Sequence, residues 1–108
     1  MLELEVAKIL TEKGVDFEYE RLLKCGNKFY FPDFIFGKIV AECTFWHDAE
    51  QRARELQRKV DQYLKLDFKL VLIVTTRRYL EEYSSRLLGN SNVRVITSDS
   101  LSELLDGK

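Results

Sequence analysis

Two acidic residues, Asp33 and Glu42, interrupt the most apolar stretch of the sequence, FYFPDFIFGKIVAECTFW at residues 29–46. The pattern around them predicts two β-strands joined by a tight turn at Gly37-Lys38, and such a hairpin would bring the two acids close together. Glu42 has no evident partner in the local sequence. Neighbouring carboxylates in an apolar setting raise each other's pKa, and burying them unpaired costs several kcal/mol. A divalent cation such as Mg²⁺ or Mn²⁺, which prefers oxygen ligands, would remove that cost.

The elements that must position these acids follow from apolar periodicity. Helical spacing predicts helices over residues 2–13, 48–66, 77–88 and 98–105, whereas alternation or continuous apolar runs predict strands over 15–23, 29–36, 38–46, 69–76 and 93–97. Caps are expected at Asp48 for the second helix, at Gly89-Asn90 for the end of the third, and at Ser98 or Asp99 for the last. The order α-β-β-β-α-β-α-β-α predicts an α/β fold, with an antiparallel three-stranded meander followed by a β-α-β unit in one mixed sheet.

Composition limits the class of protein. The chain has 108 residues, 45% of them hydrophobic and 32% charged, which is typical of a single globular domain over 1–108. No apolar run approaches the roughly 20 residues that span a bilayer, and the acidic N-terminus lacks the basic region of a secretory signal, so we expect a cytoplasmic protein without membrane contact. Two cysteines without metal-ligand spacing and one histidine make a zinc site an unfavourable interpretation.

Charge distribution is more informative than the net charge of −1. Basic residues concentrate in the second predicted helix, whose exposed side is either an ordinary solvated face or a nucleic-acid contact. Most of the aromatic residues of 29–36 are expected to fill the core. Trp46-His47 could stack on a base or supply a general base, but an ordinary loop position is the simpler interpretation.

Pro32-Asp33, followed by Glu42-x-Thr44 inside an α-β-β-β-α-β order, resembles the PD-(D/E)xK nuclease superfamily over about residues 2–75. The resemblance implies a restriction-endonuclease-like, three-layer core with a central mixed sheet. The first helix, ELEVAKILTEKG, is similar to the opening helix of the archaeal Holliday-junction resolvases, which carries a functional glutamate eleven residues before its glycine. The matching position is Glu3, and Glu5 is the alternative.

The sequence departs from the family at the third motif, Glu-x-Lys, because Thr44 stands at the lysine position. A threonine hydroxyl can orient a water molecule but supplies no positive charge. Superfamily members also carry this lysine on the following helix, which indicates Lys59. Lys38, at the turn before the strand, is the less well placed candidate.

The resemblance implies a metal-assisted hydrolysis of phosphodiester bonds. Asp33, Glu42 and the backbone carbonyl of Cys43 would bind Mg²⁺ or Mn²⁺, and Glu3 would hold a second metal or its water shell. Lys59, or Thr44 through hydrogen bonds, would orient the nucleophile. The expected substrate is branched, nicked or duplex DNA, cut by a homodimer or with a DNA-binding partner protein. The alternatives are a catalytically inactive module of the same fold that binds nucleic acid or protein, and an RNA substrate.

Overall fold

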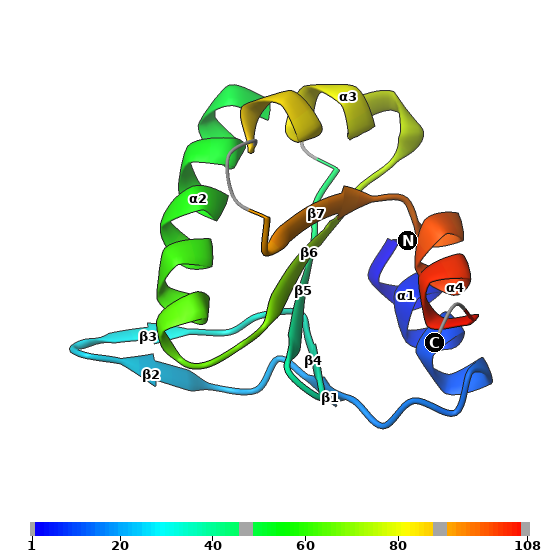
Figure 1. Cartoon of the computed structure of the whole chain (residues 1–108), viewed down its shortest axis with the longest axis horizontal. Helices are drawn as coiled ribbons and strands as arrows, with labels where there is room; N and C mark the ends of the chain where they lie inside the picture. Colours follow the sequence, from blue (N-terminus) through cyan, green and yellow to red (C-terminus); the bar gives the residue numbers. More distant parts are fainter. Residues whose placement is uncertain (1, 46–48, 88–90, 107–108) are drawn as a thin grey trace.

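The chain folds as an α/β protein with a mixed five-stranded sheet and four helices in the computed structural model, which describes residues 2–45, 49–87 and 91–106 (Figure 1). The helices are α1 (Leu2–Glu12), α2 (Ala49–Lys65), α3 (Arg77–Arg86) and α4 (Ser98–Asp106). The strands are β1 (Glu18–Tyr19), β2 (Leu23–Cys25), β3 (Lys28–Tyr30), β4 (Phe34–Phe36), β5 (Ile39–Cys43), β6 (Leu70–Val74) and β7 (Val93–Ile96). The sheet order is β1-β4-β5-β6-β7, antiparallel as far as β5 and parallel from β5 to β7.

The predicted strands over 15–23 and 29–36 are both wrong, because each is divided in two. β1 ends where Glu20 takes a left-handed backbone conformation with φ of 51°. Pro32, which has no N–H to donate to a ladder, stands between β3 and β4. β2 and β3 pair only with each other, as a two-stranded ribbon outside the main sheet. The three-stranded meander is therefore β1-β4-β5, with this ribbon inserted between its first two strands.

The β4–β5 hairpin has the predicted tight turn. Gly37, with φ of 60°, supplies the left-handed residue that the turn requires. The resulting register sets Phe34 opposite Ala41 and Phe36 opposite Ile39. Continuing that register by one residue brings Asp33 alongside Glu42, as the sequence predicts.

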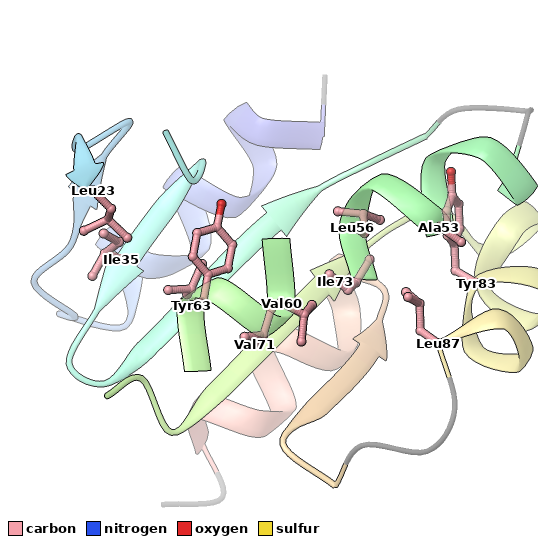
Figure 2. Packing of buried hydrophobic residues seen from close by; sticks show 11 residues of the cluster. Leu23, Ile35, Ala53, Leu56, Val60, Tyr63, Val71, Ile73, Tyr83 and Leu87 are labelled. Carbon is pink, nitrogen blue, oxygen red and sulfur yellow. The ribbon is translucent and has the colours of Figure 1, made fainter. Parts of the chain in front are cut away.

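One face of the sheet is covered by α2 and α3. The buried stripe of α2, which includes Ala53, Leu56 and Val60, packs on β5 and β6 with an aliphatic core between the layers (Figure 2). Two buried tyrosines, Tyr63 and Tyr83, lie in this layer. The opposite face is covered by α1 and α4, and its buried cluster consists of apolar side chains: Leu2, Val6, Leu10, Phe34, Phe36, Ala41, Cys43, Leu72, Val74 and Leu101.

Fewer of the aromatic residues of 29–36 enter the core than the sequence predicts. Phe34 and Phe36 are buried, but Phe29 and Phe31 are 57% and 58% exposed. They belong to the β2–β3 ribbon and the loop that follows it, where no second layer covers them in the described part of the chain.

The ends of the helices agree in part with the sequence. Thr97 caps α4, since its Oγ1 accepts a hydrogen bond from the N–H of Ser100 at 3.4 Å, so the expected caps Ser98 and Asp99 are wrong. Asp48 and Gly89-Asn90 lie outside the described residues. Within the described ranges, no helix has the length and apolarity needed to cross a membrane.

Candidate functional site

The two acids meet where β4 begins and β5 ends. The carboxylate of Glu42 is almost fully buried, with 2% of the residue exposed, whereas Asp33 is half-buried. Asp33 Oδ2 accepts a hydrogen bond of 2.7 Å from the backbone N–H of Cys43, and the Asp33 carbonyl accepts one of 3.1 Å from Glu20. Asp33 is therefore held to β5 through its side chain and to the residue after β1 through its backbone.

Glu42 has two partners on α2, contrary to the expectation that it has none. The Tyr63 hydroxyl donates a hydrogen bond of 2.5 Å to Glu42 Oε2, and Lys59 Nζ lies 3.8 Å from the same oxygen. Lys59 and Tyr63 are one helical turn apart, so both can reach the same point on the sheet. The ammonium group and the hydroxyl offset part of the cost of burying the carboxylate.

Glu3 approaches the same place from α1, on the other side of the sheet. Tyr19 donates a hydrogen bond of 2.7 Å to Glu3 Oε2. Burial raises the pKa of Asp33 to about 7; the Cys43 N–H opposes this rise, and the neighbouring Glu42 and Glu3 carboxylates add to it. Glu5, the alternative to Glu3, instead accepts a hydrogen bond of 3.1 Å from Ser98 on α4.

Cys43 lies among the three acids. Burial raises the pKa of its thiol, and the negative charges of Asp33, Glu3 and Glu42 raise it further. The thiol is therefore a protonated packing group in the α1–α4 core, and no disulfide involves it or Cys25. What Cys43 offers the acids is its backbone, of which the N–H is already used by Asp33.

Thr44, at the family's lysine position, is buried on the α2–α3 side. Its Oγ1 accepts a hydrogen bond of 3.3 Å from Nε of Arg52 and lies 3.4 Å from the Tyr83 hydroxyl. The Arg52 side chain is only 12% exposed and also pairs with Glu55 at 3.3 Å. The guanidinium of Arg52 therefore lies beside Thr44, which carries no charge of its own.

Sequence reasoning left the basic residues of this helix as either a solvated face or a nucleic-acid contact, and so missed the contact of Arg52 with Thr44. The signal was present: positions 52, 56, 59 and 63 are spaced at four, three and four residues and lie on one side of a helix. The other lysine candidate is wrong, because Lys38 lies at the opposite end of β5 and pairs with Asp67 at 3.3 Å. Trp46 and His47 lie outside the described residues.

The donor atoms fit a magnesium-type ion better than zinc, because they are carboxylate and backbone oxygens. In the parts of the chain that are described, no three His, Cys, Asp or Glu side chains are grouped so as to hold a metal alone. A dication would therefore complete its coordination with main-chain or water oxygens. The raised pKa of Asp33 supports the fit, since a bound cation would stabilise the charged form of this acid.

No protein-family model matches the chain, and no curated protein matches it. The fold and the site define an α/β protein with a carboxylate pair at one end of adjacent strands and a lysine that reaches the pair from the next helix. Its function is inferred from this geometry and from the spacing of the motif residues.

Proposed function

We propose that this protein is a Mg²⁺- or Mn²⁺-dependent DNA endonuclease with a restriction-endonuclease-like fold. The observation that carries the proposal is the 3.8 Å separation of Lys59 Nζ from Glu42 Oε2, beside Asp33. The motif that the sequence resembles requires a lysine next to the acid pair. Thr44 stands at the usual lysine position, and Lys59 on α2 is the lysine that lies next to the pair.

In this proposal, Asp33, Glu42 and the Cys43 carbonyl hold the metal ion, and Glu3 holds a second ion or its water shell. A bound dication lowers the pKa of water and stabilises negative charge on a phosphate. Tyr63 fixes the rotamer of Glu42 through its 2.5 Å hydrogen bond. Lys59 places a positive charge beside Glu42, where it would favour deprotonation of a water held at the metal ion.

Arg52 is a further cation at this end of the sheet. Its Nε is held by Thr44, so Thr44 acts as a positioning residue for the guanidinium rather than as a direct replacement for lysine. A guanidinium held in this way adds positive charge near the proposed cleavage site, where it would favour a bound phosphate.

The proposed partners are branched or duplex DNA and a second protein surface. The exposed basic side chains of α2 are partly neutralised, as Arg54 pairs with Glu50 at 2.9 Å. The chain has 108 residues and a net charge of −1, so it offers little basic surface to a DNA duplex. We therefore propose that the protein cuts DNA as a homodimer or together with a DNA-binding partner protein.

The proposal is tested by calorimetric titration with Mn²⁺ and by cleavage of a branched DNA in Mg²⁺. Asp33→Asn should weaken Mn²⁺ binding by about tenfold or more and reduce cleavage by about 10³-fold, because it removes a ligand charge. The matched control is Asp16→Asn, at an exposed aspartate outside the site. Unchanged Mn²⁺ binding in Asp33→Asn would show that the metal site is wrongly assigned.

A catalytically inactive module of the same fold is the second candidate. It is favoured by Thr44 at the lysine position and by the hydrogen bond and ion pair that Glu42 already makes within the chain. This candidate predicts no cleavage under any metal condition and no Mn²⁺ binding that depends on Asp33.

A further inference from the structure

The β2–β3 ribbon projects from the body of the molecule beside the C-terminal part of α2 (Figure 1). Two contacts fix its inner face. The Cys25 thiol donates a hydrogen bond of 2.8 Å to Gln62 Oε1 on α2, and the Tyr30 ring packs edge-on against Tyr63 at 5.9 Å between centroids. The ribbon is therefore attached to the helix that carries Lys59.

The outer face of the ribbon has a different composition. Side chains alternate along a strand, so Leu23, Cys25 and Tyr30 face the protein while their neighbours face solvent. Lys24 and Phe29 are directly paired across the ribbon, and Lys24 Nζ lies 6.0 Å from the centre of the Phe29 ring. Phe29 and Phe31 are 57% and 58% exposed, and Leu22 is exposed as well.

The charge of this segment is entirely positive. Residues 21–32 contain Arg21, Lys24 and Lys28 and no Asp or Glu. Arg21 pairs with Glu18 at 3.2 Å, which leaves the two lysines as the charges of the ribbon itself. Exposed aromatic rings beside lysines fit the bases and phosphates of a single nucleic-acid strand. They fit a second copy of this ribbon poorly, because its lysines would repel.

The ribbon also lies next to the acid pair. Phe31 is two residues from Asp33, and Tyr30 contacts Tyr63, whose hydroxyl binds Glu42. A DNA strand bound on the ribbon would therefore pass close to Asp33 and the proposed cleavage site.

We propose that the outer face of the ribbon binds single-stranded DNA, with unpaired bases stacked on Phe29 and Phe31 and a phosphate contacted by Lys24, which shares that face with Phe29. This rests on the proposed function and specifies the form of its substrate, which is DNA with an unpaired segment beside the cleavage site.

The test is fluorescence anisotropy with a labelled oligothymidylate and a labelled duplex, in EDTA so that no cleavage occurs. The double variant Phe29→Ser with Phe31→Ser should lose about tenfold in single-strand affinity for each ring removed, with little change for the duplex. The matched control is Leu4→Ser, since Leu4 is 70% exposed but lies on α1 away from the ribbon. Lys24→Gln should lower the salt slope of single-strand binding by about 0.7.

The inference is wrong if the control and the double variant lose the same affinity, if single strand and duplex are weakened equally, or if size-exclusion chromatography shows that the double variant breaks a dimer. Circular dichroism verifies that each variant is folded. Because binding is measured without metal, failure of the ribbon leaves cleavage by the Asp33–Glu42 site untouched. Loss of cleavage in Asp33→Asn likewise leaves single-strand binding unchanged.

Discussion

The two faces of the central sheet are built differently. The face under α1 and α4 is lined by apolar side chains such as Phe36, Leu72 and Val74. The face under α2 and α3 is aliphatic toward its middle but takes in Glu42, Thr44 and two tyrosine hydroxyls at one end.

This difference indicates that the two faces have different roles. The apolar face contributes mainly to stability, and the polar end of the other face contributes mainly to the proposed chemistry. An apolar face contributes through area removed from water, at roughly 25 cal/mol per Å². A buried carboxylate with a tyrosine and a lysine beside it contributes little or nothing to stability, because desolvation cancels most of the attraction. Such a group is retained where its charge is used, which is consistent with the proposed site on the α2 side.

The largest effect on stability is expected on the apolar face. Leu72→Ala should lower the free energy of unfolding by about 3 kcal/mol, since Leu72 is fully buried and its truncation leaves a cavity. Urea denaturation measures the loss, with Leu4→Ala as an exposed control that should change stability by less than about 0.5 kcal/mol. Mn²⁺ binding well below the unfolding midpoint should not change. Weakened binding there would mean that the two faces are not separable.

Lys59→Met should have a strong effect on the polar face. It keeps the apolar stem of the side chain but removes the ammonium group 3.8 Å from Glu42, so we expect cleavage to fall by about 10²-fold. Mn²⁺ binding should be unchanged or tighter, because a competing positive charge is lost. Lys65→Met, at an exposed position on the same helix, is the control. Full cleavage activity in Lys59→Met would contradict the catalytic role of this lysine.

Tyr63→Phe makes the polar face more like the apolar one. It leaves buried Glu42 without its hydroxyl donor, which should cost about 1–2 kcal/mol in the free energy of unfolding. Tyr79→Phe, on α3, provides the comparison for loss of a tyrosine hydroxyl elsewhere. If Tyr63→Phe is as stable as the wild type, the hydrogen bond does not compensate the burial of Glu42.

The smallest expected effect is a pH dependence in EDTA. Asp33 has a pKa of about 7 when folded and about 3.9 when unfolded, so the folded state binds the extra proton between these values. Stability should therefore fall as pH rises from about 4 to 7, by well under 1.4 kcal/mol per pH unit because Asp33 is half-buried and solvent screens it. Asp33→Asn should flatten this slope, and a slope of opposite sign in the wild type would contradict the assigned pKa.

The β-strands show where sequence reasoning succeeded and where it failed. The strands within 38–46 and 69–76 were predictable, since both segments are mostly apolar and β5 and β6 are buried on both faces. The alternation of 15–23 was misleading. Alternation indicates only that one side of a segment is apolar. It does not predict that the chain turns at Glu20 and leaves the sheet.

The candidate site was predictable in the same uneven way. The meeting of Asp33 and Glu42 follows from a two-residue turn, which fixes the register of a hairpin from local sequence. The contacts of Arg52 with Thr44 and of Tyr63 with Glu42 join residues 8 and 21 positions apart. Helical spacing places Arg52, Lys59 and Tyr63 on one side of α2 but does not say what that side faces.

By itself, the sequence determined the α/β class, the four helices, the buried parallel strands and the pairing of the two acids, because each depends on periodicity or on a short turn. Only the tertiary structure decided that α2 packs on the Glu42 side of the sheet, that Glu3 rather than Glu5 joins the acids, and that Phe29 and Phe31 stay in solvent. These outcomes depend on which layer covers which face, and that is set by the packing of segments far apart in the chain.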